Sequence, residues 1–511
     1  MADPRAPVII GIAQQTFRSA PDPALTPLAM LEAAARAALA DADLNNAALI
    51  DAIGVVGFAI DAPGWLSELP VPRLVDPPAS LAARLGARAG PRLYTHMGGD
   101  NPIALLGEMA RRVVAGEAEL ALIAGAEFIG NLMRLMQSGG DLSRFADPAF
   151  PERHCARFGD PRPGSSPLED RYGLALPAHT YPLFEIAWRA RRGLSPQAHL
   201  HGMAATFAKL SAVAASDPLA WFGRPYSPDE IATISPDNRM IAFPYPKRLN
   251  AFIQCDMAAA LLVTTRQRAL ELGVSPDKCA HIAGLATARE PWLLSERVDY
   301  AQCPAIARAG AAALAQAELD LSAIDRFDIY SCFPSAVALA CDALGLAMDD
   351  PRGLTLTGGL PFFGGPGNNY AMHALTRLVE QLRRGKARSG LVTANGWHLT
   401  KHAIAVLSAA APAALWRAPI LCADAPETGP VFIEAADGPA RIETYTIVHD
   451  RKGPDFAILI GRDSADRRFL AQSGDPALMD WLQRVDGVGA LGRVQQSPDG
   501  RNLFSLAEGS R

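Results

Sequence analysis

One stretch of the sequence occurs twice in related form, and this repeat limits the possible folds more than any other feature. The segment GGDNPIALLGEMARRVVAGEAELALIAGAE begins at Gly98, and GGPGNNYAMHALTRLVEQLRRGKARSGLVTANG begins at Gly364. Each passes from a Gly-Gly turn into apolar residues spaced three and four apart, then through Gly116 or Gly385 into a short apolar run. This pattern predicts a turn, a helix and a buried strand. We therefore expect a duplicated α/β architecture in which loops of both halves share one site.

The repeat also sets the expected domain boundaries. The strand VIIGIA at Val8 would open the first half, and the strand IQCDMAAALLVTT at Ile253 would close it. The expected domains are a first half (1–127 and 250–272), an insertion (128–249), a second half (273–420) and a C-terminal domain (426–511).

The insertion is rich in Pro, Gly and aromatic residues, with helical stretches at Pro182–Arg192 and Gln197–Ala215. Long segments of this kind more often shape a pocket than merely connect elements, so we expect a lid or loop domain. Its aromatic side chains could line a tunnel for an acyl or sterol-like chain, or they could form a second small core. These residues are Tyr181, Phe184, Trp188, Phe207, Trp221 and Phe222.

The C-terminal domain consists of short alternating segments, VFIEAADG, ARIETYTIVHDRKGPDFAILIGRD, RRFLAQS and GALGRVQQ. They predict an all-β domain of the size of an OB-fold barrel. Such barrels often bind nucleic acid, but this one has neither a basic surplus nor clustered aromatic residues. A structural or ligand-covering role is the better interpretation.

Composition excludes several classes of function. The 511 residues carry a formal net charge of -5 without a dense Lys/Arg run, so nucleic acid is not an expected partner. The N-terminus lacks the pattern of a signal peptide. The longest apolar stretch, Ala403–Leu415, is interrupted by Ser408 and Pro412 and is too short for a membrane span. Seven cysteines without a CxxC pair fit reduced thiols, so we expect a cytoplasmic protein.

Four segments in order resemble motifs of the thiolase superfamily, and specifically the thiolase-like protein type 1 group, whose members carry an added C-terminal domain. NAFIQCDMAAALL at Asn250 resembles the thiolase strand N-x-S-x-x-x-D-G-A-A-A, and DIYSCFPSAVALACDALGL at Asp328 lies in the place of the NEAF or HDCF loop. TGGLPFFGGPGNNYAMHAL at Thr357 lies in the place of the GG-x-x-A-x-GHP loop, and the Gly98 segment lies in the place of the nucleophile loop. The match covers nearly the whole chain. It implies an α/β fold of two halves stacked as five layers, α/β/α/β/α.

The resemblance also implies an acetyl-CoA acetyltransferase-like protein of lipid metabolism. Its substrate would be a coenzyme A thioester, and no other cofactor is expected. Thiolases are usually dimers or tetramers, so the resemblance favours a homodimer. A monomer is possible if the C-terminal domain covers the dimer face.

The positions of the thiolase catalytic residues hold other residues here. By the resemblance, the nucleophilic cysteine falls on Gly99 and the GHP histidine on Gly365. The second cysteine falls near Ala394 or Asn395, and the Asn or His of the NEAF/HDCF loop falls on Tyr330. Residues of such a set fail as a unit, so covalent thiolase chemistry should be slow or absent.

Four side chains are candidates for replacement chemistry. Tyr330 could donate to an enolate or act as a base in a retro-aldol cleavage, or it could be a core residue with its hydroxyl satisfied. Cys332 could be a displaced nucleophile or an inert buried thiol. His398 and His402 would share a helix face if HLTKH is helical, a spacing also typical of metal pairs. Without a third ligand we expect no metal, and the two are interpreted as pocket-rim histidines. His402 and Lys401 could instead meet a CoA phosphate.

A second group of residues is expected to hold the substrate. Backbone N–H groups of the two glycine-rich turns could cradle the thioester oxygen, although the same glycines could simply make tight turns. Asn368 and Asn369 suit either helix capping or binding of the thioester carbonyl. The predicted substrate-binding residues are Gly98, Gly99, Asp100, Asn101, Phe333, Gly364, Gly365, Asn368, Asn369, Tyr370 and Asn395.

Two functions therefore stay open at this stage. The first is an enzyme of the acyltransferase class that performs C–C bond chemistry, such as retro-aldol cleavage, on an acyl-CoA without a covalent intermediate. Some thiolase-fold lyases lack the cysteine and work beside a small OB-fold protein, and the fused β domain could fill that place by analogy. The second is a non-catalytic acyl-CoA or lipid binding protein.

Overall fold

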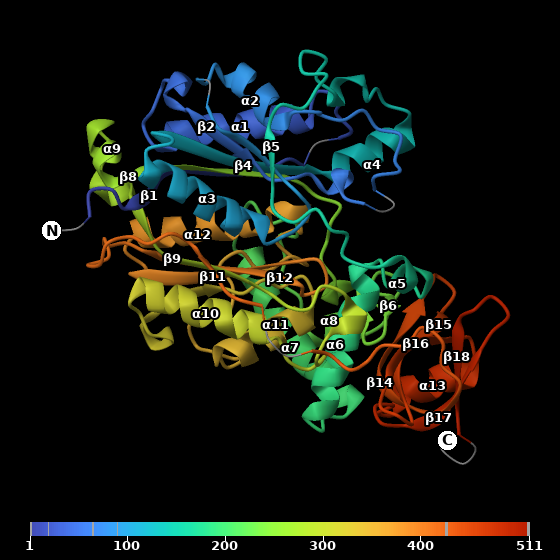
Figure 1. Ribbon diagram of the computed structural model, residues 1–511. Helices are drawn as coiled ribbons and strands as arrows, with labels where there is room; N and C mark the ends of the chain where they lie inside the picture. The colour runs from blue at the N-terminus through green and yellow to red at the C-terminus, as the bar shows by residue number, and fades with distance from the viewer. Residues whose placement is uncertain (1–2, 19, 64–65, 89, 425–427, 508–511) are drawn as a thin grey trace.

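The protein folds into two stacked halves and a C-terminal β domain (Figure 1). The computed structural model describes residues 3–18, 20–63, 66–88, 90–424 and 428–507. The first half contains the strands β1 Pro7–Thr16, β2 Ala52–Val55, β3 Arg92–Thr95, β4 Leu120–Phe128 and β8 Asp256–Thr265. Its helices are α1 Pro27–Asp41, α2 Pro77–Leu85, α3 Asn101–Ala115 and α9 Arg266–Glu271.

The second half has the same plan. Its strands are β9 Ala280–Arg289, β10 Arg326–Asp328, β11 Ser389–Gly396, β12 Lys401–Ser408 and β13 Ile420–Leu421. Its helices are α10 Pro304–Ala317, α11 Pro334–Leu344 and α12 Tyr370–Arg383.

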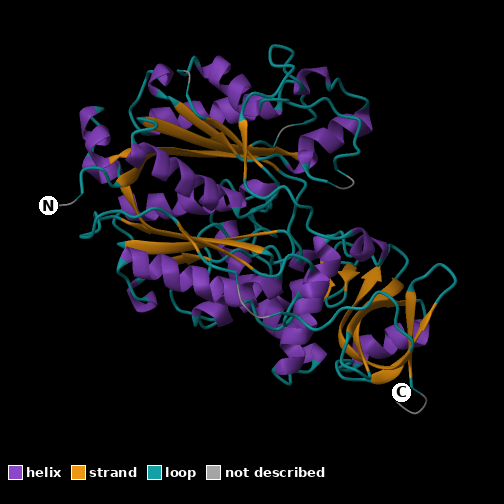
Figure 2. Ribbon diagram, in the orientation of Figure 1, coloured by secondary structure: helices purple, strands orange, loops and turns teal. Residues whose placement is uncertain are grey.

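The two halves stack as five layers, which confirms the predicted α/β/α/β/α fold. Helices α1 and α2 cover the outer face of the first sheet, α3 and α12 lie between the two sheets, and α10 and α11 cover the outer face of the second (Figures 1 and 2). The strands follow the order β10-β11-β12-β9-β1-β8-β4-β2-β3-β5. At the centre of this order, β1 and β9 are joined by the pairs Val8–His281 and Ile9–Ala280.

The repeat found in the sequence forms the middle of this stack. Its two helices are α3 and α12, and its two strands are β4 and β11. Gly116 ends α3 with φ 77°, a left-handed conformation that glycine adopts without strain. Both strands are buried along their whole length, which explains their continuous apolar sequence.

The insertion contributes to three different parts of the molecule. Its strand β5 (Ala156–Phe158) pairs with β3 and extends the first sheet. Its strands β6 (Met240–Ala242) and β7 (Tyr245–Pro246) extend the sheet of the C-terminal domain. Its helices are α4 Ile129–Ser138, α5 Pro167–Arg171, α6 Pro177–Arg191, α7 Pro196–Ala215 and α8 Pro228–Ala232.

The C-terminal domain is a barrel-like sheet around one helix (Figure 2). Its elements are β14 Gly438–His449, β15 Pro454–Asp463, β16 Arg468–Ser473, α13 Pro476–Arg484, β17 Leu491–Gln496 and β18 Asn502–Leu506. The seven strands run in the order β15-β16-β18-β17-β14-β6-β7, and β15 also pairs with β14. The sequence predicts strands alone here. Helix α13 corrects this prediction, since its Leu478, Met479 and Leu482 fill the barrel core.

Candidate functional site

The Gly98–Gly99 turn joins β3 to the start of α3 and lies at the centre of the molecule. Gly98 has φ 154°, and its N–H donates to Asn368 Oδ1 (3.0 Å) from the second glycine-rich loop. Asn101 Nδ2 donates to the His96 carbonyl (2.7 Å) and fixes the turn from the helix side. The structure thus brings the predicted residues of both halves together.

Gly99 has no free space for a side chain. A Cβ added there would lie 2.4 Å from Tyr330 Oη and 2.6 Å from the Asn395 carbonyl oxygen. Both distances are far shorter than real carbon contacts, so the phenol of Tyr330 takes up the volume that a residue at this position would use.

A buried ion pair lies on the other side of the same turn. Lys401 Nζ is 3.2 Å from Asp100 Oδ1 and donates to the Met97 carbonyl (2.6 Å). The side chains are only 6% and 10% exposed, respectively, and a Cβ at Gly98 would touch both. Lys401 is therefore held inside the protein, and the suggestion that it meets a CoA phosphate is not supported by this arrangement.

The phenol of Tyr330 keeps its proton in this environment, because its pKa is raised. Burial, together with the nearby Cys332 and Asp100, raises the pKa of Tyr330 well above its ordinary value. Its ring packs edge-on against Tyr370 at 5.4 Å, and the Tyr370 hydroxyl contacts Thr357 Oγ1 (2.6 Å). Of the two roles considered for this phenol, proton donation fits its environment and proton abstraction does not.

Cys332 is a buried neutral thiol. Burial raises its pKa to about 12, and hydrogen bonds with Tyr181 and Asn395 only partly oppose this effect. A nucleophilic cysteine requires a lowered pKa. The neighbouring Phe333 stacks between Tyr181 (4.4 Å) and Tyr245 (5.8 Å), so the expected substrate-binding position is filled by aromatic packing.

The two candidate histidines do not share a helix face, which corrects that expectation. His398 lies in the turn between β11 and β12, and His402 lies in β12. His398 Nδ1 contacts Thr180 Oγ1 (2.9 Å), and His402 Nε2 contacts Cys303 Sγ (3.2 Å). Burial lowers the pKa of each to about 3, so both are neutral and neither lies on a pocket rim. Within the described ranges no group of three His, Cys, Asp or Glu is arranged to hold a metal.

The second glycine-rich loop is also closed. Gly365 donates to the Phe252 carbonyl (2.8 Å), and a Cβ there would lie 3.2 Å from the same oxygen. Gly364, with φ 123°, would bring a Cβ to 2.8 Å from the sulfur of Met257. A histidine ring at residue 365 would therefore require its neighbours to move.

Asn368 and Asn369 behave differently from each other. Asn368 bridges the loops by accepting from the Gly98 N–H and donating to the Gly57 carbonyl (2.7 Å). Asn369 is buried with both amide atoms unpaired and points at Gly125. Neither side chain caps α12.

Glu127 is a residue of this centre that sequence reasoning did not assign. It ends the motif ALIAGAE, is 1% exposed, and accepts from the Ala59 N–H (2.7 Å). Burial raises its pKa to about 8, because backbone N–H groups offset only part of the cost of removing the charge from water. A Cβ at Gly367 would lie 2.2 Å from its Oε1, so the Glu127 carboxyl packs directly against the second glycine-rich loop. The acid at the end of an otherwise apolar strand was the available signal.

The interior beside Tyr330 is almost full. A cavity of about 10 Å³ is lined by Tyr330, Asn395 and His402 together with alanine, isoleucine and threonine side chains. This volume suits about one water molecule and no acyl chain. Of the six aromatic residues considered for a tunnel, four are buried and extend the core, namely Tyr181, Phe184, Trp188 and Phe207.

The other two aromatic residues belong to a surface above the Gly364–Gly365 loop. We call this the aromatic–arginine surface, and it consists of Trp221, Phe222, Arg224, Tyr226, Arg248 and Phe252. Phe252 contacts the rings of Trp221 (6.0 Å) and Phe222 (4.8 Å). The guanidinium carbons of Arg224 and Arg248 lie 3.9 and 4.9 Å from the Tyr226 ring centre.

This surface is directly connected to the second glycine-rich loop. Trp221 N–H donates to the Phe363 carbonyl (2.7 Å), and Gly365 donates to Phe252. Arg224 is exposed and the aromatic rings are half-buried, so both charged and aromatic groups of this surface reach solvent.

No described helix is both long and apolar enough to cross a membrane.

These features define the class of protein: a chain of the thiolase fold, with two glycine-rich loops meeting at its centre. The family profile described as "Thiolase-like protein type 1 additional C-terminal domain" matches residues 424–500. A monomeric SCP2-thiolase like protein type 1 from Mycobacterium smegmatis is similar over 99% of this chain and 100% of that chain, with 32% identity and a TM-score of 0.81. The chain therefore belongs to the thiolase-like protein type 1 family.

More distant structures share the fold. An Ltp2-ChsH2(DUF35) aldolase is 20% identical over 79% of this chain and 98% of that chain, with a TM-score of 0.57. An acetyl-CoA acetyltransferase from Syntrophomonas wolfei is 15% identical over 80% of this chain and 100% of that chain, with a TM-score of 0.55. Comparison with curated protein sequences gives no match.

Proposed function

We propose that this protein binds coenzyme A thioesters without forming a covalent acyl-enzyme. The observation that carries the proposal is the contact of Tyr330 with Gly99. The nucleophile position lacks a side chain, and its volume is already occupied. Cys332 cannot replace the nucleophile as a neutral buried thiol, and His398 and His402 are neutral and already contact Thr180 and Cys303. A thiolase scaffold altered in this way retains binding as its simplest function.

The aromatic–arginine surface supplies the chemistry that the nucleotide end of CoA requires. An adenine ring can stack on Trp221 or Phe222. The phosphates can pair with Arg248 and, in place of its ion pair with Glu230, with Arg224. Because the interior beside Tyr330 holds only about one water molecule, the nucleotide contributes most of the affinity. Free CoA, acetyl-CoA and a long-chain acyl-CoA should bind with similar dissociation constants.

Thermal-shift and calorimetric titrations with these three ligands test the proposal. All three should raise the melting temperature, and Arg248→Ala should weaken each about tenfold because one charge-assisted contact is lost. Arg384→Ala, at an exposed position on the far end of α12, serves as the matched control. Absence of a shift with every ligand would overturn the proposal. Turnover of acetoacetyl-CoA that is lost in Cys332→Ala would show covalent chemistry instead.

A second candidate function is retro-aldol cleavage, and the protonated Tyr330 favours it. Its hydroxyl faces the Gly98–Gly99 turn beside a water-sized cavity, where a proton donor could stabilise an enolate. With the interior opened for substrate, the nearby Asp100 carboxylate would take the proton of the tertiary alcohol of a β-hydroxyacyl-CoA. The Cα–Cβ bond would break to release a ketone, and Tyr330 would protonate the enolate left on the acyl-CoA. This function predicts ketone release that Tyr330→Phe abolishes, whereas pure binding predicts no release by either form.

A further inference from the structure

The turn between β11 and β12 is held in a strained conformation at the centre of the site. Trp397 and Leu399 have φ of 56° and 57°, a region that side chains with a Cβ rarely occupy. The residues on either side, Asn395 and Lys401, both contact the Gly98–Gly99 turn. Strain of this kind persists only when surrounding contacts over-determine it.

Arg297 provides the most direct of these contacts. It is 2% exposed, and its guanidinium donates to the carbonyls of His398 and Leu399 and to Thr400 Oγ1, each at 2.8 Å. One planar fork thus fixes three consecutive residues of the turn, which the point charge of a lysine cannot do. Tyr181 adds a hydrogen bond from its hydroxyl to the Trp397 carbonyl (3.1 Å).

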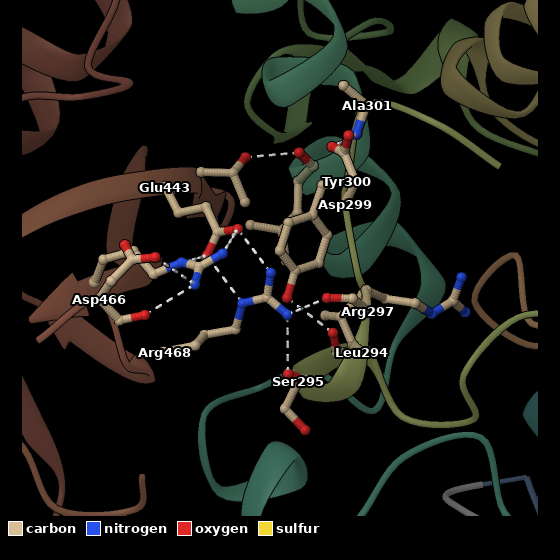
Figure 3. A network of polar contacts seen from close by, with 12 residues as sticks. Leu294, Ser295, Arg297, Asp299, Tyr300, Ala301, Glu443, Asp466 and Arg468 are labelled. Atoms are coloured by element: carbon tan, nitrogen blue, oxygen red, sulfur yellow. Dashed lines mark hydrogen bonds and ion pairs between the residues drawn. The ribbon is translucent and has the colours of Figure 1, made fainter. Parts of the chain in front are cut away.

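The C-terminal domain contacts the backbone of Ser295 and Arg297 and so fixes the position of Arg297 (Figure 3). Arg468, at the start of β16 and fully buried, donates to the Ser295 carbonyl (3.1 Å) and to the Arg297 carbonyl. Its guanidinium lies 4.7 Å from the Tyr300 ring centre and pairs with both oxygens of Glu443 (2.7 and 2.9 Å). Glu443 also pairs with Arg462, which lies 3.7 Å from Asp466, so two carboxylates face the two guanidiniums within the domain.

We infer that the C-terminal domain locks the β11–β12 turn through Arg468 and Arg297, with Arg297 as the positioning residue. The contacts form one continuous path from β16, through the backbone of residues 295–297, to the turn and from there to Asn395 and Lys401. This inference goes beyond the proposed function, since it concerns what fixes the conformation of the β11–β12 turn and requires no ligand.

Hydrogen exchange resolved by peptide, with labelling of Cys332, tests the lock. Arg297→Lys and Arg468→Lys keep the charge but remove the fork, so Glu443 retains a cation in each. In both variants the amides of residues 396–400 should exchange at least tenfold faster, and the Cys332 thiol beside Tyr181 and Asn395 should react faster with maleimide. Arg189→Lys is the matched control, because this buried arginine joins α6 to Asp486 of the same domain without touching residues 292–300.

The double variant shows whether the two arginines act in series. If they do, Arg297→Lys/Arg468→Lys should match the larger single effect and not the product of both. The inference would be overturned if the amides of residues 396–400 exchanged at the same rate in Arg297→Lys as in the native protein. This result would be decisive even if Arg468→Lys failed to fold. An equal effect of Arg189→Lys would overturn it too, because it would show general loosening of the domain interface.

Discussion

A missing side chain at Gly99 is compensated by a neighbouring one. The Tyr330 phenol and the Asn395 carbonyl fill the space, and the Lys401–Asp100 pair fills the space beside Gly98. A cysteine placed at residue 99 would therefore overpack an interior that has no free space for its side chain. A side chain at residue 99 and the present positions of Tyr330 and Asn395 therefore exclude each other.

Gly99→Cys should consequently destabilise the protein and leave it inactive in thiolysis. Overpacked interiors typically lose about 1–3 kcal/mol. Urea unfolding monitored by circular dichroism measures the free energy of unfolding, and an acetoacetyl-CoA thiolysis assay measures activity. Gly202→Cys serves as the control, because its helical position is open and should change stability little. Stability equal to the native protein would contradict the packing argument.

The buried carboxyl of Glu127 predicts a specific dependence of stability on pH. Its folded pKa, about 8, lies above the ordinary value of 4.5, so the folded state holds the proton more tightly than the unfolded state. Its contribution to the free energy of unfolding is therefore largest below pH 4.5 and falls as pH rises to about 8, with a limiting slope of ~1.4 kcal/mol per pH unit.

Glu127→Gln keeps an acceptor for the Ala59 N–H and removes the ionisation. The stability difference between this variant and the native protein should grow in favour of glutamine from pH 5 to pH 8.5, as measured by urea unfolding. Glu152→Gln at an exposed position provides the control. A difference that stays constant with pH would show that Glu127 ionises normally.

At the scale of elements, strand β5 is the addition with the clearest effect. It pairs with β3 through Leu93–Ala156, Tyr94–Arg157 and Thr95–Phe158, and the Arg157 guanidinium stacks on Tyr94 at 4.7 Å. Without β5, the edge of β3 would present unpaired N–H and C=O groups to another chain. With β5 in place the edge strand is β5 itself, and its three residues offer another chain less backbone than β3 would.

We therefore expect a monomer of 54.2 kDa in light scattering coupled to gel filtration. Arg157→Pro, in the middle of β5, should interrupt the pairing and cause self-association, because proline cannot donate to a ladder. Arg157→Ala removes the stacking contact and keeps the backbone pairing, so it should remain monomeric. A native dimer would show that β5 does not close the edge.

Elements whose signal is local could be predicted from the sequence, and those that depend on distant partners could not. The repeat predicted α3, β4, α12 and β11, because apolar spacing is a property of each segment alone. HLTKH gave no local sign that His398 would lie in a turn fixed by Arg297 and His402 in a strand. The burial of Cys332 and the placement of Tyr330 over Gly99 arise from contacts between the halves, which one sequence does not reveal.

At the scale of the whole molecule, the C-terminal domain shares its core with the rest of the chain. Val448, Ile458, Ile460 and Leu470 belong to the main hydrophobic cluster, whereas Ile186 and Phe243 of the insertion belong to the core of the barrel. Thr444 Oγ1 also donates to the Leu183 carbonyl in α6 (2.6 Å). The boundary at residue 426 separates two parts of the sequence but not two hydrophobic cores.

Urea unfolding should accordingly show a single transition, with coincident signals from tryptophan fluorescence and circular dichroism. A chain ending at residue 424 should be insoluble or largely unfolded, because its main core would lose four buried apolar residues and Arg189 would lose Asp486. Two separate transitions, or a folded truncated chain, would show that the domain is an independent unit.

The pairing of β6 with β14 has a consequence for synthesis. Ala242 leaves the ribosome roughly 200 residues before its partner Val448, which at about 5–20 residues per second is a delay of roughly 10–40 s. During this interval the β6–β7 hairpin has no sheet to join, and the apolar face of α6 has no barrel to cover it. The newborn chain therefore leaves these apolar residues of the insertion uncovered until the barrel has been made, and a chaperone could shield them during that interval.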